Sequence, residues 1–239
     1  AIPALSNLLT DNNPEIRQGA ARALDKIRPQ SLAGISALIS ALKNPDAEVR
    51  ASAAITLGKM GVSDKITVDA LINTLKTDTI VNVRSTAAIA LGYIGFMLNT
   101  NSSTNYSTNS FIIPALITAT KDVSPEVKSS AIFSLRSIGI AAKSAIPDLI
   151  IALKDNNILV RTSASYALGE MGFHAKIAIP ELLIMLQEKD KLAVVSASDN
   201  LAKIALSCQE NIKNLSQEDI GKIITNLEIA LQIMKSSKI

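Results

Sequence analysis

The chain has 239 residues, of which 48% are hydrophobic but only 3% aromatic, with no tryptophan and a formal net charge of +3. This composition favours many thin contacts between Ala, Leu and Ile over one aromatic core, and the mild charge argues against a nucleic-acid binder that depends on a strong basic field. The single cysteine, Cys208, excludes an internal disulfide, so we expect a reducing, cytoplasmic location. No run of 18 apolar residues and no signal pattern is present, so we expect no membrane partner.

One pattern recurs along the chain and predicts its architecture. Its fullest copy runs from Val160 to Gly172 and reads Val-Arg-x-x-Ala-x-x-x-Leu-Gly-x-Met-Gly. The position of its arginine recurs every 33 or 34 residues, with one gap of 44, at Arg17, Arg50, Arg84, Lys128, Arg161 and Val194. A fixed period of this size is typical of stacked helical units. We therefore predict six repeats over 1–206, at approximately 1–28, 29–61, 62–95, 111–139, 140–172 and 173–206.

Each repeat is expected to form two helices, which we call helix A and helix B. Helix A carries leucines three or four residues apart, such as Leu38 and Leu42, which places them on one face. Proline is expected at the first helical position in four repeats, at Pro3, Pro114, Pro147 and Pro180. A short polar turn follows, and helix B is the recurring pattern itself. Glycine is expected to end helix B as a left-handed residue at Gly61, Gly95, Gly139 and Gly172.

Three further glycines, Gly58, Gly92 and Gly169, lie inside helix B. Glycine within a helix costs about 1 kcal/mol relative to alanine. Its recurrence at one position of the repeat predicts that a neighbouring helix passes very close there.

Two segments depart from the repeat. Residues 96–110 are rich in Asn, Ser and Thr and are expected to form a polar loop insertion, either a tolerated one, which we favour, or a partner-binding loop. Residues 207–239 are expected to form a C-terminal capping helix, which would begin at Ser216 and cover the open end of the stack. The first residues, Ala1 to Leu5, match Ala145 to Leu149, so we expect the chain to be a fragment that opens at a repeat boundary.

The recurring pattern resembles HEAT repeats and, more narrowly, the short HEAT-like repeats associated with phycobilisome lyases. The resemblance implies an all-α, right-handed superhelical α-α solenoid, with A helices on the convex side and B helices on the concave side. It also implies an interaction scaffold, although such arrays occur in chromophore lyases as well. The first and last repeats depart from the pattern, because Arg28 and Ala205 replace the closing glycine and Val194 replaces the arginine.

A ladder of cations, one in each of five repeats, allows two interpretations. Arg17, Arg50, Arg84, Lys128 and Arg161 form it. These cations could bind anions along a strip, or they could pair with the preceding turn of their own or the adjacent repeat. The turn residues are Asp11, Asn44, Asp78, Asp122 and Asp155. Because cation and partner recur together, we favour the structural interpretation, in which a partly exposed pair contributes about 0–1 kcal/mol.

Variable positions of helix B provide the candidate binding residues. These positions lie off the Ala/Leu stripe, on the side that the family turns inward, and they form a ridge of Ile55, Ile89, Tyr93, Phe133 and Tyr166. Apolar strips with polar rims mark binding sites. The alternative is that these side chains pack between adjacent B helices.

No catalytic constellation is visible, so we expect no enzyme activity, no cofactor and no metal. His174 is the only histidine, and it has no second metal ligand or catalytic partner close in sequence. Repeated His-Glu pairs, a tryptophan and a phosphate-binding Gly-Lys loop, which other enzymes of this architecture or signalling NTPases carry, are all absent. We predict a scaffold that binds a protein or peptide on the concave face. Two alternatives stay open: a recognition segment of a larger signalling NTPase, and a phycobilin lyase or lyase subunit.

Overall fold

The structure is a computed structural model that describes residues 2–9, 11–27, 32–100 and 106–210, together with Gly221, Ile224, Thr225, Glu228 and Gln232. Every regular element in this part of the chain is an α-helix or a 3-10 helix. The chain divides into two compact units, residues 1–138 and 139–239, and each is described by itself.

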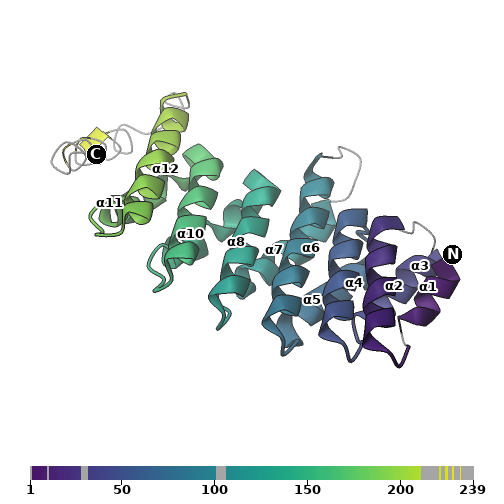
Figure 1. Cartoon of the computed structure of the whole chain (residues 1–239). Helices are drawn as coiled ribbons and strands as arrows, with labels where there is room; N and C mark the ends of the chain where they lie inside the picture. Colours follow the sequence, from purple (N-terminus) through teal and green to yellow (C-terminus); the bar gives the residue numbers. More distant parts are fainter. Residues whose placement is uncertain are drawn as a thin grey trace. The chain divides into compact units, whose positions relative to one another are not determined.

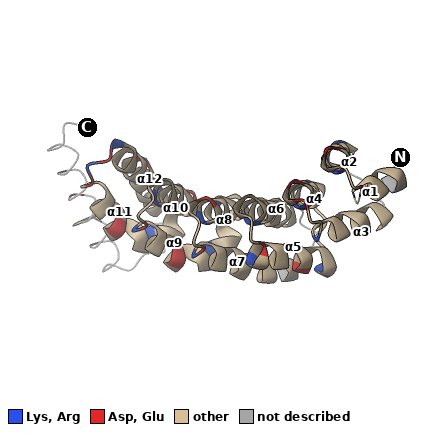
Figure 2. Ribbon diagram, turned by 60° about the horizontal axis from the view of Figure 1, so that its bottom comes forward, with Lys and Arg blue, Asp and Glu red and all other residues tan. Residues whose placement is uncertain are grey.

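Unit 1 contains four helix pairs (Figure 1). They are α1 (Ile2–Leu8) with α2 (Pro14–Ile27), α3 (Leu32–Ala41) with α4 (Ala47–Met60), α5 (Lys65–Thr77) with α6 (Val81–Thr100), and α7 (Tyr106–Ala119) with α8 (Pro125–Ile138). The B helices pack in series, with α4 between α2 and α6, and α6 between α4 and α8. The A helices form a second layer, as Figure 2 shows for α5 and α7 beneath α6 and α8.

The recurring pattern forms the core between these layers. In α6, Val83, Ala87 and Leu91 are fully buried, and Leu57 and Leu135 occupy the same repeat position as Leu91 in α4 and α8. The apolar positions recur every three or four residues, so each B helix buries one continuous stripe against its own A helix and its neighbours. Removing one such leucine would cost about 2–5 kcal/mol.

Unit 2 contains two further pairs, in which a 3-10 segment precedes each A helix. Its elements are η1 (Gly139–Ala145), α9 (Ile146–Ala152), α10 (Ile158–Met171), η2 (Gly172–Ala178), α11 (Ile179–Met185) and α12 (Lys191–Glu210). Pro147 and Pro180 lie in the first turns of α9 and α11, where a missing N–H costs no helical hydrogen bond.

Glycine ends helix B in three of the four expected places. Gly61, Gly139 and Gly172 have positive φ angles of 67°, 71° and 53° and lie at the ends of α4, α8 and α10. The prediction was wrong for Gly95, which lies inside α6. A Cβ atom at Gly95 would lie 2.6 Å from Cδ1 of Ile138, so this glycine permits close packing of α8 rather than a chain reversal.

The expected loop insertion over 96–110 was also wrong in its extent. Helix α6 continues to Thr100 and α7 begins at Tyr106, so only 101–105 separate them, and these five residues lie outside the described part. Pro114 consequently lies inside α7 rather than at its first position. Burial explains the longer helix, because Asn109 and Ile112 pack into unit 1 and Ile112 is fully buried.

Helix α12 runs past the expected end of the sixth repeat, from Lys191 to Glu210. Ser216 and most of the expected capping helix lie outside the described residues. Among the helices that are described, α6 alone is long and apolar enough to cross a membrane by length and composition, over Val81–Asn99. However, 61% of that window is buried inside the protein, which is typical of a core helix of a helical stack.

Candidate functional site

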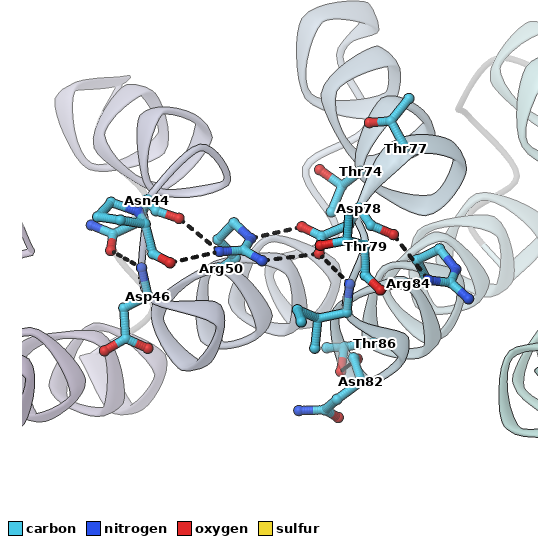
Figure 3. A network of polar contacts seen from close by, with 12 residues as sticks. Asn44, Asp46, Arg50, Thr74, Thr77, Asp78, Thr79, Asn82, Arg84 and Thr86 are labelled. Atoms are coloured by element: carbon cyan, nitrogen blue, oxygen red, sulfur yellow. Dashed lines mark hydrogen bonds and ion pairs between the residues drawn. The ribbon is translucent and has the colours of Figure 1, made fainter.

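The polar ladder joins the turns of successive repeats (Figure 3). Arg50 donates from Nε to Asp78 Oδ2 at 2.7 Å and from Nη2 to Asp78 Oδ1 at 2.9 Å. Its Nη1 donates to the carbonyl oxygens of Asn44 at 2.9 Å and Pro45 at 3.1 Å, in the turn that precedes its own helix. One guanidinium therefore fixes its own turn and clamps the next one, using the planar fork that lysine lacks.

Arg84 repeats this arrangement one unit further along. Its Nε and Nη2 each donate to the Asp122 carboxylate at 2.9 Å, and its Nη1 donates to the carbonyl oxygen of Asp78 at 2.9 Å. The side chains of Arg84 and Asp122 are 10% and 14% exposed, so solvent screens this pair only partly.

The carboxylates of the ladder also bind their own turns. Asp78 Oδ1 accepts the Ile80 N–H at 3.0 Å, and Asp122 Oδ1 accepts the Ser124 N–H at 2.8 Å. Burial alone would raise the pKa of Asp78 and of Asp122. The hydrogen bonds from Arg50 and Arg84, together with these backbone N–H groups, outweigh burial and hold both pKa values below the usual range. Both groups are therefore charged at neutral pH.

The first and fifth rungs correct part of the expected pairing. Arg17 and Arg161 bind Asp11 and Asp155 through the backbone carbonyl oxygens, at 2.9 and 2.8 Å, and not through the carboxylates. The Asp11 and Asp155 carboxylates instead accept N–H groups of their own turns, from Asn13 and Asn157.

The carboxylates that meet these two arginines were missed from the sequence. Arg17 binds Asp46 at 3.2 Å and Arg161 binds Glu188 at 2.8 Å. The sequence signal that could have identified them is an acidic residue in the turn of the next repeat, 27 to 29 residues after the arginine. Lys128, at the equivalent position of α8, is half-buried, and its charge contributes to the lowered pKa of Asp122.

A second feature is an apolar surface on the exposed side of the B helices of unit 1. In α6, Ile89, Tyr93 and Phe96 follow one another at helical spacing, so they share one face. Tyr93 is 39% exposed and Phe96 is 47% exposed, while Ile89 is half-buried. Phe133 of α8, 49% exposed, and Ile55 of α4, half-buried, occupy the same repeat position as Ile89. We call Ile55, Ile89, Tyr93, Phe96 and Phe133 the unit-1 patch.

The contact line between neighbouring B helices lies elsewhere. A Cβ atom at Gly58 would lie 2.5 Å from Cα of Ala90, and one at Gly92 would lie 2.9 Å from Cα of Ser134. This geometry confirms that glycine recurs inside helix B because the next helix passes very close. Small residues thus line the closest contact between neighbouring B helices, and the larger side chains of Tyr93, Phe96 and Phe133 stay about two fifths to one half exposed.

Four of the five ridge residues expected from the sequence belong to this patch. The fifth, Tyr166, lies half-buried on α10 in unit 2. Phe96 was missed, because the polar residues that follow it led to the assignment of 96–110 as a loop. Its helical spacing from Ile89 and Tyr93 is the signal that could have identified it.

The two side chains considered for chemistry have no catalytic setting. His174 is exposed on η2, with its ring edge-on to Phe173 at a centroid distance of 5.7 Å. Cys208 is a buried free thiol, and burial raises its pKa although the charge of Lys176 partly opposes this. Across the described residues, no three His, Cys, Asp or Glu side chains are grouped as metal ligands.

Comparison with known families matches most of the chain. The family described as HEAT repeats matches residues 35–102 and 113–202, and a second profile described as HEAT repeat matches residues 1–27. No curated protein matches the chain.

Solved structures share the fold at low sequence identity. YibA of E. coli is 23% identical over 99% of this chain and 85% of its own, with a TM-score of 0.64. The complex of CpcE and CpcF of phycocyanin lyase from Nostoc sp. PCC7120 is 23% identical over 98% of this chain and 92% of that chain, with a TM-score of 0.56. A mutant of Kap121p is 17% identical over 85% of this chain and 23% of its own, with a TM-score of 0.67. At these identities the likeness shows the helical solenoid fold alone.

Proposed function

Because the chain belongs to the HEAT-repeat family, we propose that it is a non-catalytic scaffold that binds a protein or peptide on the exposed face of its B helices. In the family's arrangement this is the concave face. The observation that carries the proposal is the unit-1 patch, where Tyr93, Phe96 and Phe133 are each about two fifths to one half exposed. The chain has only 7 aromatic Phe and Tyr residues, and three of them lie in this patch.

Aromatic side chains on a surface are costly to leave in water and are enriched where proteins bind one another. Polar residues border the patch on the same helix faces, including Ser52 and Lys59 on α4 and Thr86 on α6. An apolar centre with a polar rim is the usual anatomy of a binding surface. We also propose a cytoplasmic location, supported by the single reduced cysteine and checked by cell fractionation.

The test is affinity capture with three forms of the chain. The first is unchanged, the second carries Tyr93→Asp with Phe133→Asp, and the third carries Ile66→Asp with Val123→Asp. Ile66 and Val123 are apolar and 71% and 92% exposed, but they lie on α5 and on the turn before α8, away from the patch. A partner retained by the unchanged and third forms, and lost by the second, would support the proposal.

Stability measurements make this test decisive. Phe133→Asp should change the free energy of unfolding by no more than about 0.5 kcal/mol, because exposed positions contribute little to stability. A large loss of stability would show that Phe133 belongs to the core. Equal capture by all three forms would move the binding site away from the patch.

A second candidate function is favoured by the likeness to the phycocyanin lyase complex. We propose bilin handling only as the alternative, because the fold likeness at 23% identity carries no residue of a lyase site. Absorbance titration with phycocyanobilin provides the test. A red-shifted, saturable complex would support a lyase role, and an unchanged spectrum in the presence of an apo-phycocyanin acceptor would exclude it.

A further inference from the structure

The charges around the unit-1 patch are sorted by sign. Glu48 and Glu126 lie in the first turns of α4 and α8, and both are exposed. Each precedes a patch residue, Ile55 or Phe133, by seven residues, so it lies two helical turns away on the same face. Glu15 occupies the same position in α2. The N-terminal edge of the patch is therefore acidic, and Figure 2 shows acidic residues in the first turns of α4 and α8.

The opposite edge carries basic residues in the last turns of α2, α4 and α8. Lys59 follows Ile55 by four residues in the last turn of α4, and Lys26 lies exposed in the last turn of α2. In α6 both edge positions are uncharged, because Asn82 stands at the N-terminal edge and Tyr93 at the C-terminal edge. The patch is thus an apolar strip across three B helices, with an acidic border on one long side and basic residues on the other, where Arg136 lies exposed in the last turn of α8.

Helix dipoles explain part of this pattern, because acidic residues favour helix N-termini and basic residues favour C-termini. The dipole fixes the end of the helix but not its face. Glu48 and Glu126 both lie on the face that carries the patch, which the dipole does not require.

The shape of the strip favours a helix as its occupant. Ile55, Ile89 and Phe133 form a row across the B helices, and Tyr93 and Phe96 widen it along α6. An extended peptide turns alternate side chains away from such a surface, whereas a helix presents a stripe several residues wide. The strip also offers no strand edge, because its backbone belongs to helices. Three B helices packed about 8–10 Å apart span about 20 Å, which a helix of roughly 14 residues covers.

We infer that the unit-1 patch receives an amphipathic helix of a partner protein, laid across α4, α6 and α8. Its apolar stripe covers the patch, its basic flank faces Glu48 and Glu126, and its acidic flank lies near Lys26 and Lys59. This inference rests on the proposed function and specifies the partner's chemistry. Charge sorting at the rim fixes orientation and specificity more than affinity.

The experiment is a selection from a displayed library of 18-residue helical peptides. The apolar stripe is fixed, and the two flanks are randomised among Lys, Glu, Gln and Ser. Peptides are selected on the unchanged chain after depletion on the folded Tyr93→Asp with Phe133→Asp variant. We expect enrichment of peptides with one basic and one acidic flank, and binding about tenfold weaker when the flanks are exchanged.

A charge-reversed chain provides the matched control. Glu48→Lys with Glu126→Lys should select peptides in which the flank that faces positions 48 and 126 is acidic, with the same dependence on the apolar stripe. Enriched peptides with no charge separation, or equal binding after exchange of the flanks, would overturn the inference. Absence of any peptide that depends on the patch would overturn it as well. A partner that depends on the patch in the capture experiment but binds through a non-helical segment would leave the scaffold proposal standing while refuting this one.

Discussion

Two repeat contacts, at Gly58 in unit 1 and at Gly169 in unit 2, are closed by different atoms. Gly58 of unit 1 faces backbone, because a Cβ there would lie 2.5 Å from Cα of Ala90, whereas a Cβ at Gly92 would meet the Ser134 side chain first, at 2.5 Å from Oγ. In unit 2 the equivalent Gly169 faces a side chain, and a Cβ there would lie 2.1 Å from Oδ1 of Asn200. The ladder pairs of these repeats differ as well, since Arg84 makes two bonds to Asp122 and Arg161 makes one to Glu188, as Arg17 does to Asp46 in unit 1.

The contact at Gly169 also buries polar groups. Asn200 donates from Nδ2 to Ser165 Oγ at 3.1 Å and to the Ser196 carbonyl at 2.7 Å, and all three residues are fully buried. The Asn200 Oδ1 atom is buried against Gly169 and accepts no hydrogen bond. The repeat therefore fixes where two B helices touch, while the residues at the contact decide whether backbone or side chains set the distance. We expect the contact at Gly169 to accommodate an added methyl group more easily than the contact at Gly58.

Alanine at the two glycines should give the largest contrast. Gly58→Ala should lower the free energy of unfolding by about 3 kcal/mol, because α6 must shift as a whole and overpacking outweighs the gain in helix propensity. Gly169→Ala should cost roughly 1–2 kcal/mol, because the Asn200 side chain can rotate away. Urea denaturation followed by circular dichroism provides both values.

Gly19→Ala is the control for this pair. Gly19 lies in α2, and no atom lies within 4 Å of the position that its Cβ would take. Alanine should therefore raise stability there by about 0.5–1 kcal/mol. Equal losses at Gly58 and Gly169 would remove the distinction between the two contacts.

Removing a ladder arginine should give the next largest effect. Arg84→Met should cost about 2–3 kcal/mol, because it leaves the Asp122 carboxylate and two turn carbonyls without this donor in a largely buried setting. Arg161→Met should cost about 1–2 kcal/mol, since Glu188 is 28% exposed and solvent can replace the lost bond. The midpoints of thermal unfolding of the two variants give the comparison, and a larger loss at Arg161 would contradict it.

Acid should weaken the ladder of unit 1. The folded pKa values of Asp46, Asp78 and Asp122 lie below their ordinary value, so their charged forms contribute stability above about pH 4, the unfolded pKa. That stability is lost as the pH falls through the folded pKa values. The free energy of unfolding should decline as the pH is lowered from 7 to 2.5, and that of the Arg84→Met variant should decline less steeply. A variant curve parallel to that of the unchanged chain would show that Asp122 is not involved.

The smallest expected effect is on the rate at which the Cys208 thiol is alkylated, which reports on unit 2 alone. Burial raises the pKa of the Cys208 thiol, on the side of α12 that packs into the unit, so both access and ionisation oppose its reaction. Alkylation at pH 8 should be at least about tenfold slower than in urea. Gly169→Ala should accelerate labelling of the folded chain, whereas Gly19→Ala should leave its rate unchanged.

The sequence predicted the repeat geometry well because that geometry follows from periodic positions. The helix pairs, the close approach at Gly58 and the link between Arg50 and Asp78 all depend on spacing. Gly95 could not be assigned in the same way, because glycine serves equally for a left-handed end and for close packing. Only the position of Ile138, far along the chain, decides between them.

The same limit applies to the candidate site. Helical spacing placed Ile55, Ile89, Tyr93 and Phe133 on one side of helix B; Tyr93 and Phe133 are exposed, and Ile55 and Ile89 are half-buried. Phe96 was missed because the polar residues that follow it suggested a loop, and Asp46 was missed because Asn44 was expected to be the partner in that turn.

The ladder also bears on how such a chain changes length during evolution. Arg50 reaches an acid 28 residues later, whereas Arg84 reaches one 38 residues later, and both make the same paired contact. The ten additional residues lie where α6 and α7 are joined, at the end of the helices remote from the turns that carry the ladder. Insertions there leave every rung in place. Gene segments could therefore be gained, lost or enlarged at that junction without rewiring the contacts that hold neighbouring repeats in order.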